Sequence, residues 1–108
     1  MSRALNPTRE RLAPEPGTKL GVALSTLGLL PINGLRHLPS EGTNGWYLWC
    51  GESLGDADDF FASLHMEHLS DHLPQVLEYL DLPPGYRFQI DGQGYEDVWF
   101  DAQLLESR

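Results

Sequence analysis

The chain has 108 residues, of which 41% are hydrophobic and 10% aromatic, and it contains a single cysteine. This length and composition are typical of one folded domain whose core needs neither disulfides nor a multi-cysteine zinc site. No apolar run approaches the roughly 20 residues of a membrane-spanning helix, and residues 1–6 lack the apolar segment of a signal peptide. We therefore expect a cytoplasmic protein.

Charge is distributed unevenly along the chain. The net charge at pH 7 is -9; residues 1–51 carry five basic and three acidic groups, whereas residues 52–108 carry two basic and thirteen acidic groups. Such a surface repels nucleic acid and anionic lipid, and it speeds encounter with a basic partner. An acidic surface also serves solubility alone, so the charge leaves both interpretations open.

The first part of the chain predicts an arm followed by a helix. Prolines and a glycine interrupt residues 1–17, which have few apolar side chains, so we expect a flexible N-terminal arm there and a single α+β domain over residues 18–108. Apolar residues at helical spacing between Thr18 and Gly28 favour a short helix. A strand over residues 22–30 is the alternative.

Residues 46–50 predict a strand in the middle of a sheet, because aromatic residues favour strands and both faces of this segment are apolar. Because successive side chains of a strand alternate between its two faces, Tyr47 and Trp49 lie on one face and Trp46, Leu48 and Cys50 on the other. Residues 35–38 predict a short edge strand. Later in the chain, residues 86–91 alternate apolar and polar side chains, and residues 95–100 follow a glycine-rich turn, which predicts a hairpin.

Two helices are predicted between these strands. Carboxylates near residue 56 favour a helix N-terminus. Pro74 starts a second helix, because the residue before a proline avoids helical angles, and its buried stripe is expected at Leu73, Val76, Leu77 and Leu80. A final turn over residues 101–105 covers the sheet. The expected fold class is α+β, with a small antiparallel sheet of about four strands, a two-helix middle segment and a short N-terminal helix.

Three histidines are the strongest candidates in the sequence for metal ligands. His65, His68 and His72 share one face if their helix is continuous, and imidazole is the commonest metal ligand. Pro74 argues for a break near Leu73, however, and the order differs from the His-Glu-x-x-His pattern of zinc proteases. We expect no metal and no other cofactor. A small metal-dependent or acid–base enzyme using His65 and His68 stays as an alternative function.

Cys50 and the carboxylates favour structural roles. Cys50 lacks a neighbouring cation in the sequence that would lower its pKa, so we expect a small buried hydrophobe rather than a nucleophile. Glu96 and Asp97 alternate along one strand, so whichever face packs inward carries a carboxylate near the core. The other carboxylates sit mostly at caps and turns, which favours a solvated acidic face over an acid–base pair. No catalytic residue is expected.

Two blocks carry a family resemblance. The segment Gly45-Trp46-Tyr47-Leu48-Trp49-Cys50-Gly51-Glu52 resembles the Ser-Gly-Trp-x-Phe-x-x-Gly-x-Glu segment of the immunity-protein-33-like domain of bacterial polymorphic toxin systems. Residues 73–80, with Pro83, Gly85 and Phe88, resemble the second block of that family, a proline-led helix followed by a Pro-x-Gly turn and a strand.

The sequence also departs from that pattern. Asn44 replaces the usual serine, the family's glutamate lies one place further from the second glycine than Glu52 does, and the Trp49-Cys50 pair indicates a separate branch. The resemblance implies a small cytoplasmic protein that binds and neutralises a cognate toxin delivered between bacteria. It implies no catalytic residue.

Our first hypothesis is a non-enzymatic protein-binding module whose acidic face occludes a toxin or another basic protein, without nucleic acid or membrane partners. Tyr47 or Trp49 would anchor the partner if one sheet face is open. The charges expected to steer association are Asp56, Asp58, Asp59, Glu96 and Asp97. Besides the histidine enzyme, a ligand-binding or oligomeric scaffold domain is the other alternative. The sequence leaves the oligomeric state undetermined.

Overall fold

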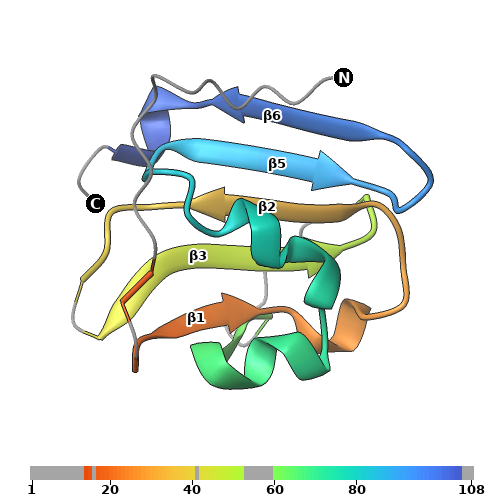
Figure 1. The fold of residues 1–108 in the computed structure, drawn as a ribbon. Coiled ribbons are helices and arrows are strands. Elements are labelled where there is room, and N and C mark those ends of the chain that lie inside the picture. Colours follow the sequence, from red (N-terminus) through yellow and green to blue (C-terminus); the bar gives the residue numbers. More distant parts are fainter. Residues whose placement is uncertain (1–13, 16, 41, 53–59, 106–108) are drawn as a thin grey trace.

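The computed structural model describes residues 14–15, 17–40, 42–52 and 60–105. These residues form one six-stranded sheet in the order β4-β1-β3-β2-β5-β6 (Figure 1). The strands are β1 (Lys19–Val22), β2 (Ile32–Arg36), β3 (Thr43–Cys50), β4 (Ala62–His65), β5 (Tyr86–Ile90) and β6 (Glu96–Phe100). Four short 3-10 helices connect or follow them: η1 (Leu24–Thr26), η2 (Met66–Asp71), η3 (Pro74–Tyr79) and η4 (Ala102–Leu105).

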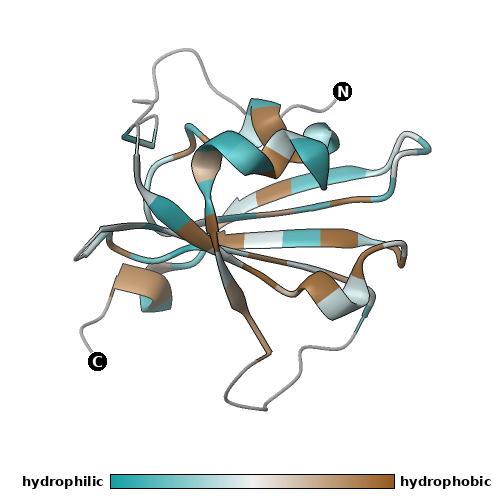
Figure 2. Cartoon of the chain, turned by 90° about the horizontal axis from the view of Figure 1, so that it is seen from below, coloured by the Kyte–Doolittle hydropathy of each residue, from teal (hydrophilic) through white to brown (hydrophobic). Residues whose placement is uncertain are grey.

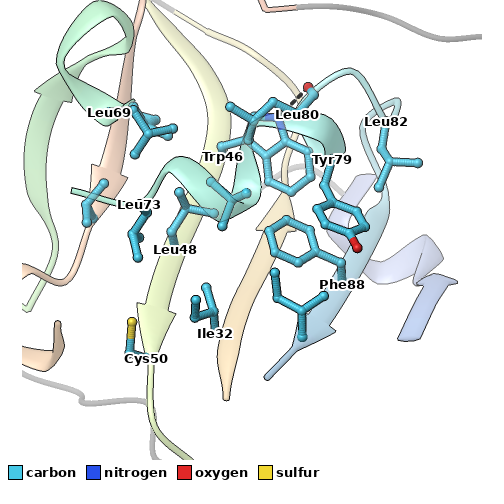
Figure 3. Close-up of a cluster of buried hydrophobic side chains, with 14 of the residues drawn as sticks. Ile32, Trp46, Leu48, Cys50, Leu69, Leu73, Tyr79, Leu80, Leu82 and Phe88 are labelled. Atoms are coloured by element: carbon cyan, nitrogen blue, oxygen red, sulfur yellow. Dashed lines mark hydrogen bonds between the residues drawn. The ribbon is translucent and has the colours of Figure 1, made fainter. Parts of the chain in front are cut away.

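The predicted central strand is confirmed. β3 lies inside the sheet, where it pairs in parallel with β1 and antiparallel with β2. Trp46, Leu48 and Cys50 point to one face and are each at most 2% exposed. This face forms the main core, because η2 and η3 pack over it (Figures 1 and 3).

The core is closed by hydrogen bonds as well as by apolar contact. The Trp46 indole Nε1 donates to the Leu80 carbonyl oxygen at 2.9 Å, which ties β3 to the residue that ends η3. The Tyr79 ring stacks on Phe88 of β5 with ring centres 4.8 Å apart (Figure 3). The second family block therefore docks on the first through Trp46, which bonds to Leu80 and whose ring centre lies 5.5 Å from that of Phe88.

Two glycines are required by this packing. A Cβ at Gly34 would lie 2.4 Å from the Phe88 ring, so the glycine lets that ring cross β2. Gly45 has a φ of +92°, and a Cβ there would lie 2.1 Å from the His37 carbonyl oxygen. Residues with a side chain rarely adopt that φ, and the Cβ would clash with backbone atoms. Only glycine therefore suits this position of β3.

The fold class differs from the expected one in its balance of strands and helices. The sheet has six strands rather than about four, one pair of strands is parallel, and the described helices are all short 3-10 segments. The protein is therefore mostly β. Three predicted elements account for the difference.

The predicted N-terminal helix is instead β1 followed by η1. Leu20 and Val22 alternate into the core, and β1 gains two hydrogen-bonded neighbours, β3 and β4, which no local helix would provide. Gly21 makes room for the Tyr47 ring, because a Cβ there would lie 2.8 Å from that ring. Tertiary pairing thus overrides the helical spacing.

The predicted edge strand over residues 35–38 is also corrected, because β2 covers Ile32–Arg36 and lies between β3 and β5. The first predicted middle helix is replaced over its described residues by β4 and η2. Its expected start at Asp56 lies outside the described residues. η3 does begin at Pro74, as predicted, but Leu77 is 44% exposed while Leu73, Val76 and Leu80 are buried.

The predicted C-terminal hairpin is confirmed. β5 and β6 pair antiparallel, from Tyr86↔Phe100 to Ile90↔Glu96. The Asp91 carboxylate closes the turn, because its Oδ1 accepts from the backbone N–H groups of Gln93 at 2.8 Å and Tyr95 at 3.1 Å. The final turn is η4, which lies on the side of the sheet opposite to η2 and η3 (Figure 2).

Candidate functional site

The outer hairpin, β5 and β6, displays three large aromatic side chains at the surface. Tyr95 is 46% exposed, Trp99 37% and Phe100 50%. Tyr95 follows the hairpin turn, whereas Trp99 and Phe100 end β6 and point to opposite faces of the sheet. Exposed aromatic residues of this kind are common anchors of protein–protein interfaces.

Trp99 is held in place by charged neighbours. The Arg87 guanidinium carbon lies 5.4 Å from the centre of the Trp99 ring, in the range of a cation–π contact. Arg87 Nη1 also lies 3.2 Å from Asp101 Oδ2, so the guanidinium is fixed from two sides. The Arg87 contact therefore favours one orientation of the indole.

A chain of polar groups crosses the sheet from β2 to the hairpin turn. The Gln89 Nε2 donates to Asn33 Oδ1 at 2.7 Å, and the Tyr95 hydroxyl donates to Gln89 Oε1 at 3.2 Å. A shallow pocket of about 290 Å³ lies beside it, lined by Leu30, Pro31, Gln89, Asp91, Gln93 and Tyr95. The amide, phenol and carboxylate groups of this lining can form hydrogen bonds with a bound molecule.

Glu96 and Asp97 have different environments on β6. The Tyr79 hydroxyl donates a short hydrogen bond to Glu96 Oε2, so Glu96 faces the core side and ties β6 to η3. Burial, followed by that bond and the charge of Glu96, raises the pKa of Tyr79 well above its usual value. Asp97 points to the other face and is exposed. The expectation that one of the two carboxylates lies near the core fits this arrangement.

The aromatic residues expected to anchor a partner lie on the face opposite to the core. Tyr47 is half-buried between His37 and Phe61, with ring centres 5.5 and 5.1 Å away. Trp49 is only 6% exposed, and Phe61 packs edge-on against it at 6.3 Å. Trp49 therefore offers little surface to a partner.

The expected steering residues Asp56, Asp58 and Asp59 lie outside the described residues. Trp99 and Phe100, by contrast, are not among the anchors that the sequence predicts. Their signal in the sequence is that two aromatic residues end a strand of a terminal hairpin, a position that becomes exposed only when that strand is at the sheet edge.

The histidines do not share one helical face. β4 ends at His65 and η2 begins at Met66, so the chain changes direction between His65 and His68, whose ring centres lie 6.1 Å apart. His72 follows the end of η2. Within the described residues, no group of three or more His, Cys, Asp or Glu side chains is arranged to hold a metal ion.

Cys50 is the small buried residue that the sequence predicts. It is 2% exposed, and burial raises the pKa of its thiol, which opposes thiolate formation. A helix long and apolar enough to cross a membrane was not found among the described residues.

Comparison with known proteins identifies one family. The model of the Imm33-like domain matches residues 5–101, which is most of the chain. The comparisons with curated proteins and with solved structures gave no match. The matched range contains β1 to β6, including both blocks in which the sequence resembles this family. The chain therefore belongs to the Imm33-like domain family.

Proposed function

We propose that this protein is a non-enzymatic cytoplasmic immunity protein that binds a cognate toxin and blocks its active site. The observation that carries the proposal is the match of the Imm33-like domain over residues 5–101. Burial of Cys50 and separation of the histidines along β4 and η2 are consistent with a binding role. The partner's active site would be occluded physically, without chemistry in this chain.

The partner in this proposal is a basic protein. The net charge of -9 would accelerate encounter with a basic surface and disfavour nucleic acid and anionic lipid. We assign steering to Asp56, Asp58, Asp59 and Asp97, as the sequence predicts. Glu96, which is bonded to Tyr79, would contribute mainly through its charge.

We assign the main anchor to Trp99, because it is exposed and oriented by Arg87. Tyr47 is a secondary candidate, since part of its ring is accessible. Trp49 would act indirectly, by supporting Phe61 and the face on which Tyr47 lies. Loss of a central aromatic anchor commonly weakens an interface by about 2 kcal/mol or more, which is roughly a 30-fold change in Kd.

The test is co-expression with the product of the gene beside this one. Wild-type protein should restore growth of cells that express a toxic neighbour, and the two proteins should co-purify. Trp99→Ala should weaken the complex roughly 30-fold, whereas Leu77→Ala, which removes an exposed apolar side chain from η3, should leave it unchanged. Failure of the wild-type protein to bind or rescue would overturn the proposal.

A further inference from the structure

A buried asparagine fixes the direction of the polar chain that runs from β2 to the hairpin turn. Asn33 is 6% exposed, and its Nδ2 donates to three backbone carbonyl oxygens, those of Pro31 at 3.3 Å, Trp49 at 3.3 Å and Gly51 at 2.9 Å. Because carbonyl oxygens only accept, the Asn33 Oδ1 is left to accept from Gln89 Nε2, at 2.7 Å. The Gln89 amide therefore turns its own oxygen, Oε1, toward the Tyr95 hydroxyl.

The Asp91 carboxylate is fixed at the same end of the sheet. Ile32 of β2 pairs with Ile90 of β5, so the chain that precedes β2 and the turn that follows β5 lie together (Figure 1). Asp91 Oδ1 accepts from two N–H groups of that turn. A carboxylate has about four acceptor sites, so these two bonds orient the group and leave acceptor capacity on Oδ2.

The pocket between these two segments combines oriented acceptors with apolar walls. Gln89 and Asp91 are half-buried in it, whereas Leu30 is 49% and Tyr95 46% exposed. Its six lining residues carry one formal negative charge and no positive charge. The volume of about 290 Å³ is near the lower limit of small-ligand pockets, roughly 300 Å³. It therefore suits a single side chain better than a cofactor.

We propose that this pocket binds an arginine side chain of the partner protein. A guanidinium has five N–H donors and no acceptor, which matches the Asp91 carboxylate and the Gln89 Oε1. Its flat face can stack on the Tyr95 ring, and its alkyl stem can pack on Leu30. That this partner is a toxin rests on the function proposed above, whereas the preference for a guanidinium rests on the pocket itself.

Charge and hydrogen-bond direction disfavour other occupants. An anionic group would meet the Asp91 carboxylate and the Gln89 oxygen, and the net charge of -9 disfavours it further. A lysine ammonium is a compact, strongly hydrated charge, which stacks less well than a guanidinium on an aromatic ring such as Tyr95. Arg87, the cation of β5, is paired with Asp101 at the other end of the hairpin. The negative charge in the pocket therefore favours an arginine from outside β5.

The probe is arginine with both ends blocked, N-acetyl-L-arginine N-methylamide, added to the full-length protein and followed by NMR. We expect saturable shifts of the Gln89 side-chain amide and of the Gln93 and Tyr95 backbone amides. The Kd should be on the order of 1–10 mM, because a single side chain offers few contacts. The same compound made from citrulline, which has a similar shape without the charge, should bind about tenfold more weakly. The lysine compound should bind about threefold more weakly than the arginine compound.

Three results overturn the proposal. The first is absence of saturable shifts with the arginine compound. The second is equal binding of the citrulline or the lysine compound, because the pocket would then not select a guanidinium. The third is a rise in affinity for the arginine compound when Arg3, Arg9 and Arg11 are replaced by glutamine, because a segment of the same chain would then be the occupant.

Variants of the protein test the lining residues separately. Asp91→Asn keeps an oxygen that can close the turn and removes the charge, so it should weaken binding of the arginine compound about three- to fivefold. Asp71→Asn removes the same charge from the exposed surface of η2 and should have no effect. Tyr95→Leu should also weaken binding several-fold, whereas Tyr95→Phe, which keeps the ring, should retain most of it. Melting curves establish that each variant is folded, and unchanged binding by folded Asp91→Asn overturns the proposal.

The same two aspartate variants separate the pocket from the immunity function. In the complex with the toxin, Asp91→Asn should weaken binding about tenfold or more and Asp71→Asn should not. Equal effects of the two variants overturn the assignment of the pocket to the partner and leave the immunity function intact. If the arginine compound binds and no toxin does, only the immunity function fails.

Discussion

Arg36 shows how a single charged residue can connect distant parts of the core. It is 1% exposed; its Nε donates to the Asn44 carbonyl at 2.9 Å, and its Nη1 donates to the Leu82 carbonyl at 2.8 Å. Burial lowers the pKa of the guanidinium, and the charge of Asp81 opposes that shift. Arg36 thereby links β2 and β3 to the segment after η3.

We expect Arg36→Met to destabilise the protein by about 2–4 kcal/mol, because buried carbonyl oxygens would lose their donors while the side-chain volume is kept. Arg36→Lys should recover only part of this loss, since an ammonium group cannot reproduce the fork of the guanidinium. Urea unfolding followed by circular dichroism measures both. Equal stability of the methionine variant and the wild type would contradict a structural role for these bonds.

Cys50 gives a second prediction at the residue scale. Because the thiol is buried and its pKa is raised, alkylation by iodoacetamide should require opening of the sheet. We expect labelling to be slower than for the urea-unfolded chain by about a thousandfold or more. Mass spectrometry over a time course measures the rate, and rapid labelling of the native protein would show that β3 is exposed.

At the scale of elements, one hydrogen bond connects η3 to the edge strand. The Tyr79 hydroxyl donates to Glu96 on β6, while its ring stacks on Phe88 of β5. Tyr79→Phe and Glu96→Gln, alone and combined, form a double-mutant cycle. We expect a coupling free energy of about 1–2 kcal/mol from thermal or urea unfolding. Additive effects would mean that the bond does not support β6.

Burial of the Tyr79 hydroxyl, together with this bond, predicts a dependence of stability on alkaline pH. The pKa of Tyr79 is raised in the folded state, so the folded protein retains a proton that the unfolded chain loses above pH of about 10. This contribution to stability is complete below that pH and decreases as the pH rises further. The stability difference between wild type and Tyr79→Phe should therefore shrink above pH of about 10, measured by urea unfolding across that range.

At the scale of the whole molecule, charge sets the rate at which a partner is found. Residues 52–108 carry thirteen acidic and two basic groups. With the proposed basic partner, the association rate constant should fall about tenfold or more between 50 and 500 mM NaCl, because salt screens attraction between separated charges. Stopped-flow fluorescence measures it. The dissociation rate constant should change less, since close contacts around Trp99 are screened less.

The salt dependence of the association rate constant also distinguishes two uses of the acidic surface. If the charge serves solubility alone, association with the partner should be insensitive to salt, and Asp97→Asn should leave its rate unchanged. A salt-sensitive rate that Asp97→Asn lowers modestly would support steering by the β6 surface.

The sequence alone determined the parts of the fold that depend on local pattern. The alternation of apolar and polar side chains and the glycine-rich turn were enough to predict the β5–β6 hairpin, because its strands are joined by a short turn closed by Asp91. Two apolar faces were enough to place β3 inside the sheet, and the absence of a nearby cation predicted a buried, unreactive Cys50. The two family blocks likewise led to the Imm33-like domain.

Only the tertiary structure decided where the remaining strands lie and what is exposed. The apolar residues around Leu20 fit a helix as well as a strand until β3 and β4 pair with β1, and β2 becomes central only because β5 returns beside it. The same strand order buries Trp49 under Phe61 and leaves Trp99 at the edge. Both are aromatic residues in strands, and they differ because exposure depends on neighbours that are distant in sequence.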